Sequence, residues 1–454
     1  MKICAYVQEA YAKSCYKNEC LDTRQFVGLR IIIDCLERSG YEVEFAGIAT
    51  VHTYDVALVS ITSDCDWWSF IGERIRWKKS DTKVLVGGAG VLHVSPFIRW
   101  VYAVMFGRGE NLIVPLIDGI RSGNRYEHAS IAYSDSFSPD NIYYIAQVEQ
   151  PYRYEISLTP DKKFIESTIG CNHRCLFCGY TWQRKFISPY GQYKMDDSLF
   201  GNIADKERAM LDLYSGGKPV DFAHLRTTSI DGFSERIRMA VNKPITRSMI
   251  SGFLEMMVES DAKPHRIKFY NICGYPTESE QDMLEFVEIL KDVDGKSPKR
   301  EKKWCTDIHC TPFRAMPATP LACAPMEKKD YREYIKRVFL KNGGYSFFDG
   351  NAIWGLIGAY TEGLPSVMLS ALAHRGSLQD SENIARLCAT KKFWSASSAV
   401  KEKTLSKYFD MDYLFGPFTS ETLPSRYLRT YAHVEKMWGN TPLERETNAK
   451  SETL

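Results

Sequence analysis

The sequence predicts an α/β protein that begins with a doubly wound parallel sheet and ends in a mainly helical region. Within residues 1–125, short apolar runs alternate with segments whose apolar residues recur at helical spacing, and this alternation is typical of a parallel sheet covered by helices. In residues 328–454, helical spacing dominates between Gly and Pro breaks. The residues between these two regions hold a group of closely spaced cysteines, which is where the sequence points to chemistry.

The N-terminal elements follow one another in a regular order. Residues 1–7 form a short apolar run, and residues 26–38 carry Val27, Ile31 and Leu36 at helical spacing. Further elements are expected as strands at residues 42–46, 56–61 and 84–86 and as a Trp-rich helix at residues 67–77. This order predicts a Rossmann-like parallel sheet.

A ligand site is expected at one edge of this sheet. In doubly wound sheets, ligands bind beyond the carboxyl ends of the strands. Ser60 and Thr62 stand at the end of one predicted strand, and the glycines of residues 87–90 stand at the end of the next. Glycines at such positions allow a backbone to approach a ligand closely.

Composition and charge are those of an ordinary globular protein. The 454 residues include 58 Lys and Arg against 56 Asp and Glu, a net charge of +2. This balance gives no support to nucleic acid as a partner. Residues 1–10 lack the basic and apolar regions of a signal peptide, and no run reaches the ~18 apolar residues of a membrane span. We therefore expect a cytoplasmic protein with no membrane partner.

Three of the thirteen cysteines stand close together. Cys171, Cys175 and Cys178 have the spacing C-x3-C-x2-C. Three thiolates on one loop can converge on one soft metal centre and leave one metal position without a protein ligand, which is what a reaction needs. A structural zinc site, the alternative, needs a fourth ligand. His173 is awkwardly placed for that role, and the spacing specifies no other.

With Phe177 directly before the third cysteine, the triplet resembles the cluster motif of the radical S-adenosylmethionine superfamily. The resemblance implies a 4Fe-4S cluster held by Cys171, Cys175 and Cys178, with S-adenosylmethionine chelating the fourth iron. It also implies one-electron cleavage of S-adenosylmethionine to a 5′-deoxyadenosyl radical and a flavodoxin- or ferredoxin-like reductant as partner. Phe177 would pack near the adenine, and a core aromatic is an equally good interpretation of that side chain.

The same resemblance implies that residues 161–327 form a partial (β/α) barrel. The alternation that such a barrel requires is present, with helices expected at residues 197–214, 247–260 and 278–292 and strands at residues 223–229, 267–273 and 306–311. In a barrel of this kind, catalytic groups lie at the carboxyl ends of the strands.

Contacts to S-adenosylmethionine need a replacement for one family residue. The superfamily usually has Gly-Gly-Glu after the first helix, whereas this chain has Gly216-Gly217-Lys218, and lysine cannot accept a hydrogen bond from the methionyl amine. Gly274 would leave room for the adenine, as the resemblance implies. The candidates for amino or ribose contacts are Ser229, Asp231, Ser234 and Glu235. For any one of them, an ordinary polar turn with a helix cap is the alternative.

Two further cysteines are candidates for a catalytic role. Cys273 and Cys310 stand near the ends of predicted strands, where we expect them to face the cavity. A thiol there can donate a hydrogen atom or a proton. Packing is the commoner role of a buried cysteine.

The N-terminal region carries a second resemblance. The segments at residues 54–62, 83–90 and 106–110 resemble, in this order, the cobalamin-binding domain of one class of radical S-adenosylmethionine enzymes. The cobalt-ligating histidine of many such domains is missing, because residues 19–28 contain none. Either the domain binds cobalamin without a protein histidine, or it keeps the fold as a scaffold or lid, which we favour. Residues 126–160 are expected to be the linker to the next domain.

These observations lead to one leading hypothesis and two alternatives. The leading hypothesis is a radical S-adenosylmethionine enzyme that abstracts hydrogen from an unidentified substrate, in an isomerisation or other modification of a nucleobase, peptide or metabolite. The first alternative is a cobalamin-dependent radical S-adenosylmethionine methyltransferase. The second is a zinc-stabilised binding module, which predicts tetrahedral zinc and no cofactor cleavage.

Overall fold

The computed structural model describes the part of the chain that holds the predicted cysteine motif. The described residues are 1–8, 27–187, 227–259, 266–296 and 305–326, without residues 64, 79, 139, 140, 143, 160, 161, 165, 167, 168, 172, 173, 323 and 325, together with residues 335, 337, 338, 382, 383, 386, 387 and 403–409. The expected helix at residues 197–214 and most of the expected C-terminal helices lie outside these residues.

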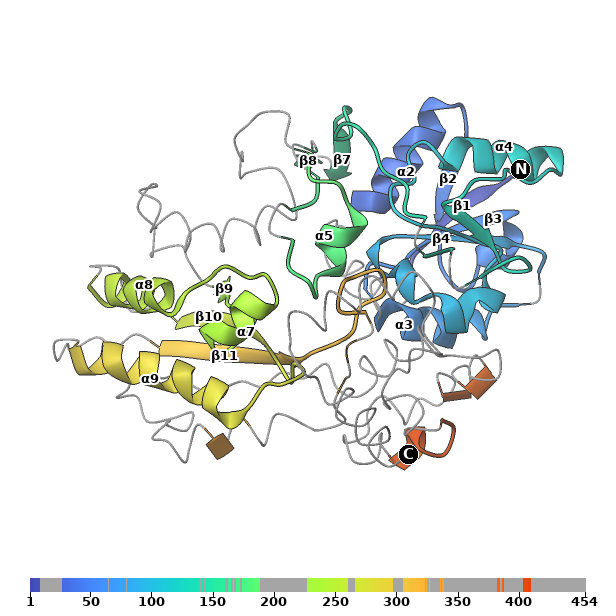
Figure 1. Ribbon diagram of the computed structural model, residues 1–454. Helices are drawn as coiled ribbons and strands as arrows, with labels where there is room; N and C mark the ends of the chain where they lie inside the picture. The colour runs from blue at the N-terminus through green and yellow to red at the C-terminus, as the bar shows by residue number, and fades with distance from the viewer. Residues whose placement is uncertain are drawn as a thin grey trace, which may run out of the picture.

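A six-stranded sheet forms the N-terminal part (Figure 1). Its order is β2-β1-β3-β4-β5-β6, with β6 antiparallel to β5 and every other pair parallel. The strands are β1 (Ile3–Tyr6), β2 (Val43–Ala46), β3 (Val56–Ser60), β4 (Lys83–Gly87), β5 (Ala103–Met105) and β6 (Ile131–Tyr133). The predicted α/β class and mainly parallel sheet are confirmed. β6 lies within the segment expected to be a linker and forms an antiparallel edge.

Helices cover both faces of this sheet because both faces are apolar. Side chains alternate between the faces of a strand, so Val56 and Leu58 of β3 pack in one core while Ala57 and Val59 pack in another, with Trp67. The covering helices are α2 (Val27–Arg38) and α4 (Ile113–Ser122) on the first side and α3 (Cys65–Arg74), η3 (Ala89–His93) and η4 (Ser95–Trp100) on the second. A short turn, η2 (Val51–Thr53), precedes β3.

Gly88 shows that the glycines after β4 serve the packing of the chain itself. Its φ is +112°, and a Cβ at this position would lie 2.3 Å from the carbonyl oxygen of Ile61. Gly90 is similarly close to the backbone of Ser63. The close approach expected here is therefore made to the loop that follows β3.

Replacing Gly88 with alanine is expected to destabilise the N-terminal sheet by about 2–3 kcal/mol, because the new Cβ meets backbone and the positive φ is strained. Gly47→Ala is the matched control, since a Cβ there has open space and its φ is ordinary; we expect a change of about 0.5 kcal/mol or less. Urea unfolding measures both. Equal stabilities of the two variants would contradict the packing role of Gly88.

A second parallel sheet follows the cysteines. Its order is β11-β10-β9, and its helices α8 and α9 pack against each other and the sheet (Figure 1). The elements are β9 (Thr227–Ser229), α7 (Glu235–Ala240), α8 (Arg247–Glu259), β10 (Arg266–Cys273), α9 (Glu280–Lys296) and β11 (Cys305–Pro312). The expected strands and helices of this region are present. Their closure into a partial barrel stays a prediction.

Short elements lead from the first sheet to the second. β7 (Ile156–Thr159) and β8 (Lys162–Phe164) form an antiparallel pair, and the helix α5 (Gly179–Gln183) follows the third cysteine of the motif. Among the described helices, none is both long and apolar enough to cross a membrane.

Candidate functional site

The cysteine loop, which carries Cys171, Cys175 and Cys178, lies between the carboxyl ends of the two sheets (Figure 1). On one side, Gln183 at the end of α5 donates a hydrogen bond from Nε2 to the carbonyl of Ala89, just after β4, at 3.2 Å. On the other side, the ring of Phe177 lies 6.1 Å from that of Tyr275, just after β10. Doubly wound sheets and β/α barrels both bind their ligands at the carboxyl ends of the strands, so the cysteine loop lies where a site is expected.

Neighbouring segments hold the backbone of this loop. The Leu176 N–H donates to the carbonyl of Val241 at 2.9 Å, and the Leu176 carbonyl accepts from the N–H of Leu321 at 3.3 Å. Trp182 donates from Nε1 to the carbonyl of Cys175 at 2.9 Å. The three contacts come from α5, from the end of α7 and from the segment after β11, so the loop is fixed by several parts of the fold.

The three cysteines of the motif form no disulfide, with Cys175 buried and the other two half-buried. Burial raises the pKa of the Cys178 thiol. The negative charges of Asp231 and Cys171 add to this rise, while backbone N–H groups at the start of α5 hydrogen-bond the sulfur and oppose it. The pKa of Cys178 therefore responds both to the charge of Cys171 and to the N–H groups at the start of α5.

This donor set fits an iron-sulfur cluster. Thiolates are the soft ligands that such clusters use, and hydrogen bonds to sulfur tune their potentials. Among the described residues, no three His, Cys, Asp or Glu side chains are gathered to hold a metal ion. Binding a cluster therefore requires the thiols of Cys171, Cys175 and Cys178 to turn toward a common centre.

An aromatic group borders the cysteine loop on the side of the second sheet. Tyr275 is buried and packs against Phe177 and against Phe313, whose ring lies 5.1 Å away. The Tyr275 hydroxyl donates to the backbone carbonyl of Asp231 at 3.1 Å, and burial raises the pKa of Tyr275 well above its ordinary value. The three aromatic rings make this side of the loop apolar.

Asp231 is the predicted cofactor contact whose negative charge raises the pKa of Cys178. It follows β9 with a φ of 51°, in the left-handed region. Lys243, which is 2 % exposed, donates from Nζ to Asp231 Oδ2 at 2.8 Å. The ion pair fixes the carboxylate at the carboxyl end of β9.

The other predicted contacts have defined partners in the fold. Ser234 caps α7, accepting from the N–H of Ile237 at 3.2 Å and donating to Asp282 Oδ1 at 2.6 Å. Glu235 accepts from the N–H of Arg247 at 2.6 Å. Both side chains thus serve the packing around α7.

Two further predicted contacts stand at strand ends. Ser229 is the last residue of β9 and is half-buried. Gly274 directly follows β10 with a φ of 79°, and its N–H donates to the Glu278 carboxylate. Their roles toward a cofactor stay predictions.

Cys273 and Cys310 do not face the side of the sheet that was expected. Both are fully buried in the core that α8 and α9 form over the sheet, together with Phe253 and Phe286. The Cys273 thiol donates to the carbonyl of Thr311 at 3.4 Å, and burial with the neighbouring Cys310 raises the pKa of Cys273. Successive side chains of a strand point to opposite faces of the sheet. The face away from α8 and α9 is therefore lined by residues adjacent in sequence to these cysteines, such as Thr311.

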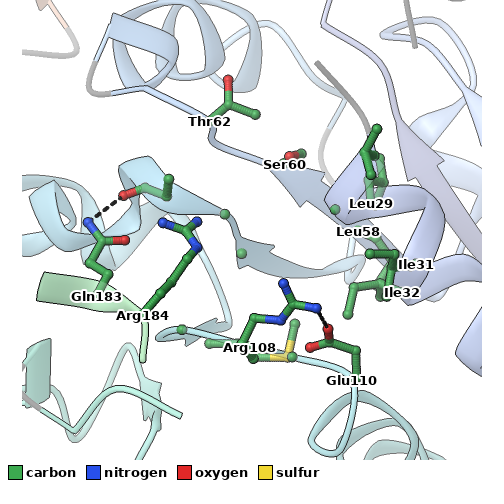
Figure 2. Close-up of a pocket in the computed structure, with 18 of the residues that line it drawn as sticks. Leu29, Ile31, Ile32, Leu58, Ser60, Thr62, Arg108, Glu110, Gln183 and Arg184 are labelled. Atoms are coloured by element: carbon green, nitrogen blue, oxygen red, sulfur yellow. Dashed lines mark hydrogen bonds and ion pairs between the residues drawn. The ribbon is translucent and has the colours of Figure 1, made fainter. Parts of the chain in front are cut away.

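A cavity of about 300 Å³ opens between the first sheet and α5, the helix that follows the cysteines (Figure 2). Its walls are mainly apolar, with Leu29, Ile31 and Ile32 from α2 and Leu58 from β3. The other lining residues include the expected Ser60, Thr62, Gly87 and Gly88, together with Gly107, Arg108, Gly109, Glu110, Glu166, Tyr180, Gln183 and Arg184. No histidine is among the described residues that line it.

A charged network joins the first sheet to the residues before the cysteines. Arg108 donates from Nη1 and Nη2 to the two carboxylate oxygens of Glu166, at 2.7 and 2.6 Å, and also pairs with Glu110. Glu166 accepts from the N–H of Tyr152 at 2.7 Å. Sequence reasoning noted the segment that contains Arg108 but missed the pairing. A contact between positions 58 apart has no local signal in the sequence.

Comparisons with known proteins give distant likenesses. No family model matches the chain. No curated protein matches it either. Among solved structures, the chain is similar to the cobalamin-dependent S-adenosylmethionine radical enzyme OxsB, in its apo, selenomethionine-labelled form at 10% identity and a TM-score of 0.28, over 96% of this chain and 70% of that one.

OxsB is also matched in two liganded forms. The form with aqua-cobalamin has 11% identity and a TM-score of 0.29, over 96% of this chain and 70% of that one. The form with aqua-cobalamin and S-adenosylmethionine has 10% identity and a TM-score of 0.26, over 96% and 71%. At these scores the likeness carries no argument about function, which has to come from the chain's own residues.

Proposed function

We propose that this protein is a radical S-adenosylmethionine enzyme whose cluster is held by Cys171, Cys175 and Cys178. The observation that supports this most is the position of the triplet: three thiols that form no disulfide, on a loop that the fold anchors at the carboxyl ends of two parallel sheets. When bound, a 4Fe-4S cluster would supply the electron that cleaves S-adenosylmethionine to a 5′-deoxyadenosyl radical.

The chain's own residues have three tasks in this proposal. Phe177, packed against the buried Tyr275 and with Phe313 behind them, excludes water from one side of the cysteine loop and offers a surface for the adenine. The backbone N–H groups at the start of α5 stabilise the negative charge of the Cys178 sulfur. Asp231, oriented by Lys243, provides the carboxylate that holds the amino or ribose groups of S-adenosylmethionine.

Replacing Asp231 with asparagine is expected to raise the KM for S-adenosylmethionine by about tenfold, because a hydrogen bond to a charged group is lost. Iron content should not change, since the amide can still accept from Lys243. Cofactor cleavage at varied S-adenosylmethionine concentrations measures the KM. Asp135→Asn, a change at an exposed position just after β6, is the control. An unchanged KM in Asp231→Asn would remove Asp231 from the cofactor site.

Cobalamin fits this chain less well. A protein histidine for cobalt is lacking both in residues 19–28 and among the described residues of the cavity. The methyltransferase is therefore the second candidate, and the cavity at the carboxyl ends of the first sheet is the feature that favours it. The substrate class, an organic molecule with an unactivated C–H bond, follows from the proposed chemistry.

Metal analysis tests the proposal. Anaerobically reconstituted protein should contain about four irons and four sulfides per chain. Cobalt in stoichiometric amount after incubation with cobalamin would favour the methyltransferase. One zinc per chain without iron would overturn the proposal and support the zinc-stabilised binding module.

A further inference from the structure

We propose that the cavity between the first sheet and α5 binds a small organic monoanion, with its anionic group held by Arg184 and its apolar body against α2. The proposal goes beyond the proposed function, because it assigns a ligand class to a site outside the cysteine triplet and does not depend on a cluster being bound.

Arg184 is the cationic group that the cavity leaves without a hydrogen-bonded anion. It directly follows α5 and points into the cavity beside Gln183 (Figure 2). Its Nη1 is buried and has no hydrogen-bond partner among the described residues. The guanidinium lies 4.4 Å from the centre of the Tyr180 ring, which orients it. A buried guanidinium N–H group without a partner is unfavourable, and a ligand anion that accepts a hydrogen bond from Nη1 would remove this cost.

The two carboxylates among the described residues of the cavity share one cationic partner other than Arg184. Glu110 and Glu166 both pair with Arg108, and each of these side chains is at most 13% exposed. These three groups carry a net charge of −1, and Arg184 brings the lining to neutrality. The net charge of the lining therefore does not attract an anion, and a ligand anion is held by local hydrogen bonds from the Arg184 guanidinium. A dianion meets more repulsion from the two glutamates than a monoanion does.

Burial disfavours the charged form of Arg184. Removal from water lowers the pKa of the Arg184 guanidinium. Tyr180 and Glu166 oppose this change, and the positive charge of Arg108 adds to it. Arginine nevertheless stays charged at neutral pH. A ligand carboxylate or phosphodiester that accepts two of its N–H groups relieves this destabilisation.

The shape of the cavity sets the rest of the ligand. The wall opposite Arg184 carries Leu29, Ile31 and Ile32 of α2, with Leu58 of β3 beside Leu29 (Figure 2). A volume of about 300 Å³ is at the small end of pockets that bind organic molecules. The lining therefore matches an anionic head with an apolar body of a few carbon atoms.

Calorimetric titration of the full-length, reconstituted protein tests this assignment. The probes are octanoate, its neutral analogue octanol and inorganic phosphate at constant ionic strength. We expect octanoate to bind at least about tenfold more tightly than octanol, because the charge-assisted hydrogen bonds are lost with the carboxylate. Phosphate without an apolar body should bind more weakly than octanoate. Equal binding of octanoate and octanol, or no octanoate binding, would overturn the proposal.

Three variants locate the bound anion. Arg184→Gln should weaken octanoate binding about tenfold or more, and Ile32→Phe should weaken it by filling the cavity. Arg121→Gln, which removes an exposed cation on α4, should bind octanoate as the parent does. Unchanged binding in Arg184→Gln or in Ile32→Phe would refute the site. Iron counted on the same samples reports separately on the cysteine triplet, so failure of one proposal is distinguishable from failure of the other.

Discussion

Alanine in place of Cys171, Cys175 or Cys178 is expected to remove essentially all bound iron and all cofactor cleavage. Each cysteine supplies one of three protein ligands, and a cluster that already has one iron without a protein ligand does not tolerate a second vacancy. The fold should survive, because these residues form no disulfide and the loop is held by backbone contacts. Iron and sulfide per chain, measured after anaerobic reconstitution, give the result.

Cys35→Ser is the control for this series. Cys35 is half-buried on α2, with its Sγ 3.5 Å from the Tyr152 hydroxyl, and serine keeps a donor at this position. We expect the iron content of the parent protein. A variant of the triplet with its full iron complement would contradict the assignment of the cluster ligands.

Arg238→Met is expected to lower the free energy of unfolding by about 3–5 kcal/mol, because it leaves buried polar groups without partners. Arg238 is fully buried and donates to three carbonyls: to Ile245 at 2.6 Å and to Gly232 and Phe233 at 2.9 Å. It also pairs with Glu285 at 3.5 Å. Burial lowers the pKa of Arg238 to about 10, so the guanidinium remains charged at neutral pH.

Loss of the Arg238 hydrogen bonds also affects the proposed cofactor site. Gly232 and Phe233 directly follow Asp231, so the carbonyls that Arg238 binds position the proposed cofactor carboxylate. Arg121→Met, at an exposed position, is expected to change stability by about 0.5 kcal/mol or less. Urea unfolding of both variants checks the difference. Equal stability would show that the loop after β9 does not depend on Arg238.

The parts of the fold that could be predicted from the sequence are those with strong local patterns. β3 is apolar on both faces and ends in polar residues, so its existence and its place in a covered parallel sheet follow from its composition. β10 and α9 likewise lie within one to four residues of the expected bounds. The C-x3-C-x2-C spacing marked the loop that the fold places between the two sheets.

Long-range pairing and side-chain direction could not be predicted in this way. β10 and β11 have apolar residues in both phases, so the pattern did not show that Cys273 and Cys310 lie under α8 and α9. Arg184 has no distinctive neighbours in the sequence. Arg184 has no ion-pair partner among the described residues of the cavity because Glu110 and Glu166 both pair with Arg108. No local sequence pattern reveals this pairing.

Reductive cleavage of S-adenosylmethionine tests the central claim most directly. The reconstituted protein is reduced with dithionite under anaerobic conditions, S-adenosylmethionine is added, and 5′-deoxyadenosine is quantified, with Cys175→Ala treated in parallel. We predict 5′-deoxyadenosine from the parent protein and none from the variant. A protein that binds one zinc, holds no iron and releases no 5′-deoxyadenosine would contradict the assignment of this chain as a radical S-adenosylmethionine enzyme.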